Sequence, residues 1–464
     1  MSIDHDLFDE MLPWQAPAPV RRSRFQPAAP QYAALNVEVN LGRIGAFHFT
    51  RRGERNVLLL DFQTQLDQNY PRRLGSGRGG VYRGYYLKGV GRTLAAANWN
   101  DTGERYHGSG HMPPTSAARE WLITQYLRSS GLAHTIVPCE TVLAAPLTAT
   151  QRHEISAGYT SVNLQRAPAD GLLQVLSAKQ ANFARMSNIV WALDHFCFEP
   201  GFIGRLFLAL DRLLRPPDAR NSAQGDPAEI AEAMEAAYLR TLSAFRSWSA
   251  HGLFWLYLQN NFTLDGRYVD LETPLLFGSP FVGIRHRARN GEIERTVIGF
   301  EELWLAWYWR LFLARLRHQL QYLCFPGVLP DRPAFLYVRQ VLREINGRFP
   351  ASHPIFDNKG LAQSASAHLA RLLHLKSKAK HQLSELAIYQ LANVTGAKPP
   401  SEPDLSWIEA PAASPFIPIG SDSRVFVPGW LATREWPTGL GFDAKLKRLE
   451  HCREPRQFLE ALSN

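Results

Sequence analysis

Most strand-like segments lie in the first third of this chain, and helical spacing dominates from about residue 185 onward. In the early part, Gly79 to Val90 is rich in Tyr and Val, which favour extended backbone. In the later part, apolar residues recur every three to four positions over long segments. This order predicts an α+β protein with a small mixed lobe followed by a large, mainly helical lobe.

The same patterns predict the domain boundaries. Residues 1–30 hold five prolines and no steady period, so we expect an extended N-terminal arm. Residues 31–150 form the predicted small lobe, and residues 151–464 form the predicted helical lobe. In the small lobe we expect a strand at Val57 to Phe62, a helix at Ala117 to Leu127 that Gly131 caps, and a strand at Thr135 to Leu143.

The helical lobe is expected to contain six long helical segments separated by polar, proline-bearing loops. The loops are expected at 216–226 and 398–422. The predicted helical segments are Ile189 to Cys197, Phe202 to Leu214, Pro227 to Trp248, Glu301 to Leu323, Pro333 to Ile345 and Leu361 to Leu391.

Charge and cysteine content narrow the classes of function. The net charge is +9, from 51 basic and 42 acidic residues, but these residues are interspersed, so nucleic-acid binding is not expected. The four cysteines show no CxxC spacing, which favours a reducing compartment over a disulfide or zinc framework. There is no secretory signal and no apolar span of membrane length, so we expect a soluble, cytoplasmic protein.

Two charged residues are candidates for a buried ion pair. Lys88 ends an apolar strand, where an ammonium group needs a charged partner. Glu120 lies in the Ala117 to Leu127 helix, and a helix carboxylate can hold a strand lysine against nucleotide phosphates. An exposed edge lysine and an exposed helix glutamate are the alternative interpretations.

A glycine-rich segment precedes Lys88 and suits an anionic ligand. The backbone at Gly75 and Gly77 can approach phosphates closely, and Arg78 adds a guanidinium that can fork onto them. A glycine-rich hairpin turn is the alternative interpretation.

The segment 259–274 suits a metal ion. Asp265-Gly266 predicts a turn between two short strands that brings Asn261 and Asp270 to one side. An amide oxygen and a carboxylate are typical protein ligands for a phosphate-bound Mg²⁺. A plain β-hairpin with polar ends is the alternative interpretation.

Taken in chain order, the glycine-rich segment, the Lys88 strand, the Glu120 helix and the segment 259–274 resemble those of the selenoprotein O family. The resemblance covers roughly residues 35 to 275. The family's glycine segment is similar to LGDGRA, matched by residues 74–79, and its nucleotide lysine lies in LKGAG, matched by residues 87–91. Its helix glutamate follows an arginine, as Glu120 follows Arg119 here. Its metal-binding asparagine and aspartate have the separation of Asn261 and Asp270.

The resemblance implies a protein-kinase-like bilobal fold that binds ATP with Mg²⁺ or Mn²⁺ and transfers AMP to protein hydroxyl groups. It also implies that arginines between the lysine and metal segments contact the nucleotide, and Arg166 and Arg185 are the best positional matches. The stretch from Lys88 to Glu120 is longer than in the family. His251 lies about three residues too early for the family's histidine, so we interpret it as a capping or core residue.

Asn260 stands where the family has an aspartate that can accept the hydroxyl proton. Because an amide accepts no proton at neutral pH, the acceptor here either is already an anion, such as a carboxylate, or is not modified at all. We therefore expect a transferase that moves AMP, or less readily phosphate, to a protein or peptide, as in the family's peptide natural-product (microcin-type) branch. The alternative is a pseudokinase that binds nucleotide and acts as a scaffold for a partner protein.

Overall fold

The structure is a computed structural model of the 464-residue chain. The residues that it describes are 21–24, 26–27, 38–41, 47–48, 79–82, 85–89, 112, 114–146, 173–180, 182–186, 189, 193, 201–251, 253–255, 261–272, 274–276, 283–287, 293–297, 300–329, 331–373, 376–395, 397–398, 401, 416–419, 423–426, 448–449 and 452–463. They form a mixed α+β protein in which helices predominate. The predicted strand at Val57 to Phe62 lies outside the described residues.

The chain divides into two compact units. The first comprises residues 1–191, 268–272 and 441–464, and the second comprises 192–267 and 273–440. The first unit therefore extends beyond the boundary near residue 150 that the sequence predicts. It does so because strand β8 (Leu173–Gln180) pairs with β6 (Tyr85–Lys88) and β7 (Thr141–Pro146) in one sheet.

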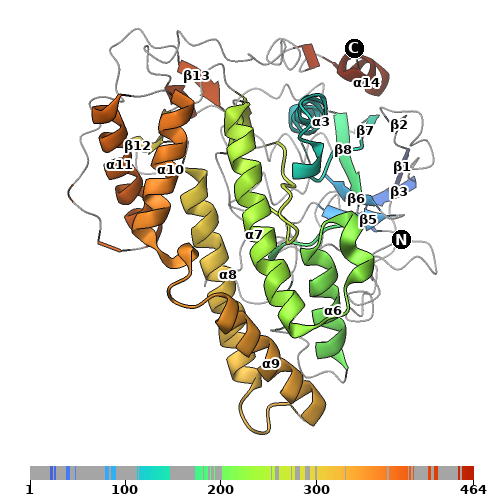
Figure 1. The fold of residues 1–464 in the computed structure, drawn as a ribbon. Coiled ribbons are helices and arrows are strands. Elements are labelled where there is room, and N and C mark those ends of the chain that lie inside the picture. Colours follow the sequence, from blue (N-terminus) through green and yellow to red (C-terminus); the bar gives the residue numbers. More distant parts are fainter. Residues whose placement is uncertain are drawn as a thin grey trace. The chain divides into compact units, whose positions relative to one another are not determined.

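The main sheet of the first unit has five antiparallel strands in the order β2-β7-β8-β6-β5 (Figure 1). Its outer strands are β2 (Gln26–Pro27) and β5 (Gly79–Tyr82). The sequence predicts one strand over Gly79 to Val90, but the structure has two, with Tyr82 opposite Tyr85. A second sheet joins β1 (Arg21–Arg24), β3 (Glu38–Leu41) and β4 (Phe47–His48), so the predicted N-terminal arm contributes strands to both sheets.

Helix α3 (Pro114–Ser129) packs on β7 and β8 and confirms the predicted helix. Gly131 follows it with φ of +72°, and the amides of Leu132 and Gly131 donate to the carbonyls of Leu127 and Arg128 at 2.8 and 3.2 Å. This is the Schellman arrangement that a glycine at this position favours. The chain then forms a 3₁₀ turn, η2 (Ala133–Thr135), so β7 starts six residues later than the predicted strand.

The C-terminal helix α14 (Pro455–Ser463) also belongs to the first unit. Its Phe458 and Leu462 are buried in a cluster with Val142 of β7 and Val175 of β8. The sequence analysis assigned the C-terminal region to the helical lobe. The structure corrects this, because the apolar face of α14 is covered by the sheet of the first unit.

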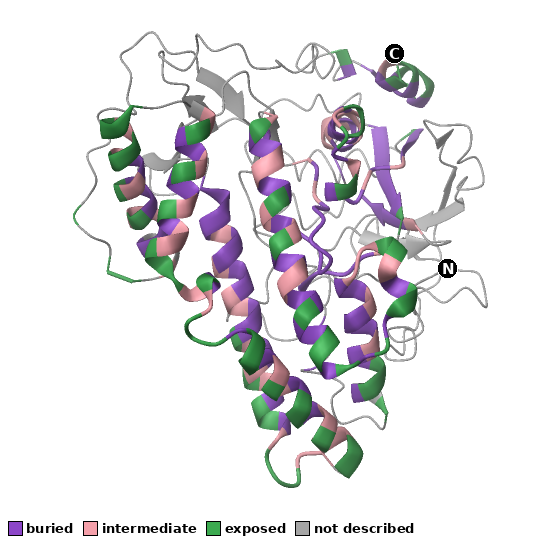
Figure 2. Ribbon diagram, in the orientation of Figure 1, coloured by how far each residue is buried: buried purple, intermediate pink, exposed green. Residues whose placement is uncertain are grey.

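The second unit is built mainly of helices, and its described helices lie close to predicted ones; the predicted segment Ile189 to Cys197 lies mostly outside the described residues. The helix α7 begins where Asp226 accepts hydrogen bonds from the amides of Ala228 and Glu229 at 2.8 and 3.2 Å. Buried positions recur along these helices with exposed positions between them (Figure 2). The elements are α6 (Phe202–Leu214), η3 (Pro217–Ser222), α7 (Pro227–Ala250), α8 (Glu301–Leu323), α9 (Arg332–Arg348), η4 (Pro354–Phe356), α10 (Asn358–Leu373) and α11 (Ser377–Thr395).

Two features of the second unit differ from the prediction. The segment Leu361 to Leu391 forms two helices, α10 and α11, which pack against each other. The unit also contains strands beyond the short hairpin predicted at 259–274: the pair β9 (Leu253–Trp255) and β10 (Pro274–Leu276), and a four-stranded antiparallel sheet. Its order is β12 (Ile293–Val297), β11 (Gly283–Arg287), β14 (Ser423–Phe426) and β13 (Phe416–Ile419).

Within the described part of the chain, no helix is long and apolar enough to cross a membrane.

Candidate functional site

The ammonium group of Lys88 lies among three carboxylates at the end of β6. Its Nζ is 2.5 Å from Oδ1 of Asp270, 2.9 Å from Oε1 of Glu272 and 3.0 Å from Oε1 of Glu120. The Lys88 side chain is only 6% exposed. Because a buried ammonium is costly unless it is paired and hydrogen-bonded, these contacts explain how an apolar strand can end in a lysine.

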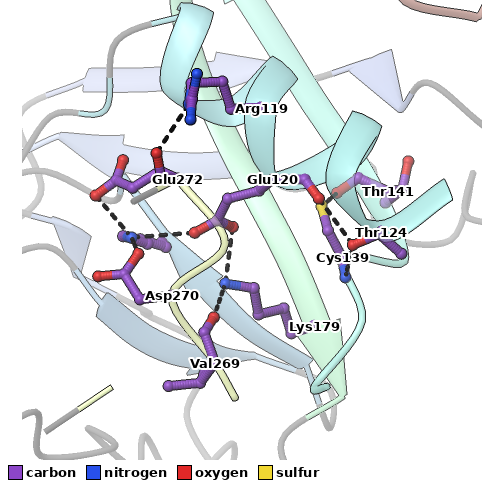
Figure 3. Close-up of polar contacts among 10 residues, drawn as sticks. Arg119, Glu120, Thr124, Cys139, Thr141, Lys179, Val269, Asp270 and Glu272 are labelled. Carbon is purple, nitrogen blue, oxygen red and sulfur yellow. Dashed lines mark hydrogen bonds and ion pairs between the residues drawn. The ribbon is translucent and has the colours of Figure 1, made fainter. Parts of the chain in front are cut away.

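Glu120 is completely buried on α3 and binds two lysines (Figure 3). One carboxylate oxygen, Oε1, faces Lys88, and the other, Oε2, is 2.7 Å from Nζ of Lys179 on β8. Lys179 also donates a 2.7 Å hydrogen bond to the carbonyl of Val269. Glu120 is thus shared by the ammonium groups of two adjacent strands.

The strand register explains why both lysines reach Glu120. In the antiparallel pair β6 and β8, Tyr86 lies opposite Lys179, and directly opposite residues share one face of a sheet. Lys88 is two residues beyond Tyr86 on β6, so its side chain lies on the same face. Both lysines therefore project to one side of the sheet.

The segment 268–272 brings the remaining groups to the first unit. The amide of Val137 donates to the carbonyl of Tyr268 at 2.7 Å, and the amide of Tyr268 donates to Thr135 at 2.9 Å. Nε of Arg119 donates to the carbonyl of Glu272 at 2.9 Å. Hydrogen bonds to the backbone at Tyr268 and at Glu272 therefore hold in place the segment that carries Asp270 and Glu272.

Cys139 lies beside the cluster but is poorly suited to act as a nucleophile. Burial raises the pKa of its thiol, and the neighbouring Glu120 carboxylate raises it further. Its amide donates to the hydroxyl of Thr124 at 3.0 Å, and that hydroxyl donates to the carbonyl of Glu120 at 2.7 Å (Figure 3). These contacts give Cys139 and Thr124 a structural role in fixing the helix turn that carries Glu120.

The structure brings together three of the predicted site residues, Lys88, Glu120 and Asp270. Asn261 is buried in the second unit, so its predicted approach to Asp270 stays a prediction. Arg185 is buried in the first unit. The other predicted site residues lie outside the described part of the chain: Gly75, Gly77, Arg78, Arg166 and Asn260.

The predicted turn at Asp265-Gly266 is confirmed, but its setting differs from the prediction. The amide of Gly266 donates to the carbonyl of Thr263 at 3.0 Å, and Gly266 has φ of +90°. The sequence places strands directly beside this turn. Instead, the paired strands β9 and β10 lie farther out, with Trp255 opposite Pro274.

The side chain of Asp265 organises a second charged cluster, in the second unit. Its Oδ2 accepts hydrogen bonds from Arg220 at 2.7 Å and Arg267 at 2.8 Å, and its Oδ1 accepts one from the hydroxyl of Thr263. Nε of Arg240 on α7 donates to the Asp265 carbonyl at 3.0 Å. The turn is therefore anchored on the helices around it.

His251 occupies the C-cap position of α7, and its Nδ1 is 2.8 Å from the carbonyl of Ser247. This confirms the interpretation of His251 as a capping residue.

Sequence reasoning missed Lys179 and Glu272. Lys179 had a visible signal, since it is a lone lysine at the end of the largely apolar run 172–178. Glu272 had none, because nothing in the segment around it points to Lys88 and only the fold brings the two together.

The carboxylate oxygens of the site are ligands that suit a hard divalent cation such as Mg²⁺. Among the described residues, no three or more His, Cys, Asp and Glu side chains are grouped so that they could hold a metal ion by themselves. Mg²⁺ does not need such a cage, because it is typically bound by one or two carboxylates together with substrate phosphates. Asp270 and Glu272 present two carboxylates of this kind on one short segment.

Comparison with known proteins found no match: no protein-family model fits the chain, and no curated protein or solved structure is significantly similar to it.

Proposed function

We propose that this chain is an ATP- and Mg²⁺-dependent transferase of protein-kinase-like fold that transfers AMP to a protein or peptide. The observation that carries the proposal is the contact of Lys88 with both Glu120 and Asp270. Kinase-type catalysis needs a strand lysine held by a helix carboxylate, close to an aspartate that can bind metal. All three groups were predicted from separate segments of the sequence, and their meeting supports a common role.

In this proposal each residue has a defined task. Lys88 donates to the phosphates of ATP, and Glu120 holds the lysine in place. Asp270 binds the Mg²⁺. The cation neutralises phosphate charge when it is bound. The predicted phosphate cradle of Gly75, Gly77 and Arg78, and the arginines Arg166 and Arg185, would complete the contacts to the nucleotide.

The reaction would join an acceptor oxygen to the α-phosphorus of ATP. The bond from that phosphorus to the oxygen bridging to the β-phosphate breaks, and pyrophosphate leaves. A hydroxyl acceptor must also lose its proton, and Asn260 cannot take it. A carboxylate acceptor loses no proton and gives a mixed anhydride, so we favour a peptide or protein carboxylate.

The position of the labelled phosphate in ATP distinguishes AMP transfer from phosphate transfer. The protein would be incubated with Mg²⁺, candidate peptides and ATP labelled at either the α- or the γ-phosphate. We expect acceptor label from the α position only, and at least a 100-fold loss of labelling in Lys88→Ala and Asp270→Ala. Glu460→Gln is a matched control, because Glu460 is exposed and pairs with the neighbouring Arg456 on α14. Label from γ alone would replace the proposal with a kinase.

A scaffold that binds nucleotide without transfer is the second candidate, and Asn260 in place of a proton acceptor is the observation that favours it. Thermal stabilisation by ATP with no transfer of either label would support the scaffold. If ATP neither stabilises the protein nor labels an acceptor, both candidates are rejected.

A further inference from the structure

The three donors of the Lys88 ammonium group are matched by three carboxylates. An ammonium carries three hydrogens and no more, and Glu120, Asp270 and Glu272 each lie within 3.0 Å of Nζ. A phosphate can therefore accept a hydrogen bond from Lys88 only if at least one carboxylate gives up its place.

The carboxylates that can give way are Asp270 and Glu272. Glu120 is completely buried, and its second oxygen is held by Lys179, which also holds the carbonyl of Val269. Glu120 therefore keeps a cationic partner whether or not Lys88 turns toward a ligand. Asp270 and Glu272 are slightly exposed, at 12% and 9%, and can be reached by a solvated ion.

The negative charge of this cluster means that Lys88 can leave the carboxylates for a phosphate only when another cation replaces it. The five side chains of Lys88, Lys179, Glu120, Asp270 and Glu272 carry one more negative than positive charge. If Lys88 left Asp270 and Glu272 for a phosphate, both carboxylates would lose their contact with its ammonium group and would repel the incoming anion. A divalent cation bound to Asp270 and Glu272 would replace the lost ammonium contact and would also attract the incoming phosphate.

We propose that Glu272 is a second cation-binding carboxylate beside Asp270, and that Lys88 occupies their shared position until a divalent cation takes it. This inference rests on the proposed function, and it adds a binding order: the nucleotide binds well only with the cation. Because coupling between two ligands is reciprocal, nucleotide must strengthen cation binding by the same factor.

The test measures binding rather than turnover. Affinity for a fluorescent ATP analogue would be determined in EDTA and in saturating Mn²⁺, and Mn²⁺ binding without nucleotide would be followed by electron paramagnetic resonance. For the wild-type chain we expect Mn²⁺ to raise nucleotide affinity by about 30-fold, which corresponds to a coupling of about 2 kcal/mol. In Glu272→Gln we expect this factor to fall below about 5-fold, with tighter binding in EDTA. Glu460→Gln should match the wild type.

A second variant tests whether Lys88 occupies the cation position. Lys88→Met removes the competing ammonium, so we expect it to bind Mn²⁺ about tenfold more tightly than the wild type in the absence of nucleotide. Mn²⁺ binding that is unchanged in Lys88→Met and in Glu272→Gln would overturn the inference.

The outcomes separate this inference from the proposed function. Nucleotide binding by wild type and Glu272→Gln with equal dependence on Mn²⁺ overturns the role of Glu272 and leaves the proposed function standing. Failure of the wild-type chain to bind nucleotide, with and without Mn²⁺, overturns the proposed function and the coupling together.

Discussion

Asp265 and Asp270 are five residues apart in the chain, yet they belong to clusters of opposite design. Asp265 is a central carboxylate that receives hydrogen bonds from two guanidinium groups and a hydroxyl. Asp270 is one of three carboxylates around a central ammonium. In the first cluster cations surround one anion, and in the second anions surround one cation.

The difference indicates which cluster can exchange partners. Guanidinium groups stay charged and hold a carboxylate in a fixed fork, so the Asp265 cluster is suited to fastening a turn. An ammonium is a compact charge that another cation can replace, and the carboxylates around Lys88 are in excess. We therefore interpret the Asp265 cluster as structural and the Lys88 cluster as the candidate site.

The largest expected effect is the loss of stability on removing the central anion of the structural cluster. Asp265→Asn removes the carboxylate charge that pairs with the buried Arg220 and Arg267, and breaking a buried ion pair typically costs about 3–5 kcal/mol. Denaturant unfolding followed by tryptophan fluorescence would measure it, since Trp248 and Trp309 are buried in the same unit. Asp218→Asn, at an exposed residue of η3, is the control. If Asp265→Asn lowered the free energy of unfolding by less than about 1 kcal/mol, the Asp265 cluster could not be called structural.

A smaller loss is expected at the turn that this cluster fastens. In Gly266→Ala the new Cβ would lie 2.8 Å from the carbonyl oxygen of Ala237 and 2.9 Å from Oγ1 of Thr241, at φ of +90°. We expect a loss of about 2–3 kcal/mol. Gly347→Ala on α9 is the matched control, because among the described residues no atom beyond its chain neighbours and its own helix backbone lies within 4 Å of the added Cβ. Alanine should stabilise that helix by up to about 1 kcal/mol.

In the candidate site, removing one charge should barely alter stability. Glu272→Gln keeps an oxygen that can accept from Lys88 and removes the excess negative charge. We expect the free energy of unfolding to change by less than about 1 kcal/mol, in either direction, in the same denaturation assay. A loss as large as that of Asp265→Asn would mean that both clusters are structural, and the distinction between them would fail.

Another small effect concerns pH and a half-buried histidine of the second unit. His368 Nε2 is 2.9 Å from Oγ of Ser249, and burial lowers its pKa below 6.5, with Arg246 and Arg371 adding to this and Glu302 opposing it. Because the folded chain favours the neutral ring, stability should fall as pH decreases below about 6.5, by at most about 1.4 kcal/mol per pH unit.

Thermal unfolding at pH 7.5 and 5.5 would measure this effect. His368→Gln should lose less stability between the two values than the wild type, and His381→Gln, at an exposed residue, should behave as the wild type does. Equal losses in His368→Gln and the wild type would show that His368 does not contribute to the acid sensitivity.

The sequence predicted the elements that are determined locally. The helices α6 and α8 have the predicted bounds, and α7, which Asp226 caps, ends two residues later than expected. Their apolar spacing lies within the segments themselves, so local pattern is enough to find them. Pairing between distant segments could not be read in this way. Strand β14 pairs with β11, more than 130 residues earlier, and β8 joins a sheet whose other members carry no pattern that selects it.

The residues of the candidate site also fall into those that local sequence pattern could predict and those that it could not. Lys88 and Glu120 could be predicted because a charged side chain in an apolar segment requires a partner. Lys179 could have been added by the same argument, since it ends a buried strand. Glu272 could not, because its position beside Lys88 depends on the path of segment 268–272, which local pattern does not determine.

The first unit is assembled from both extremes and the middle of the chain, and this has a consequence for its biosynthesis. Strand β2 near the start and helix α14 at the end both contact β7. During translation, β6 and α3 leave the ribosome long before Asp270 and α14 are made. A nascent chain halted before residue 455 therefore leaves the apolar side of β7 that α14 covers exposed to chaperones.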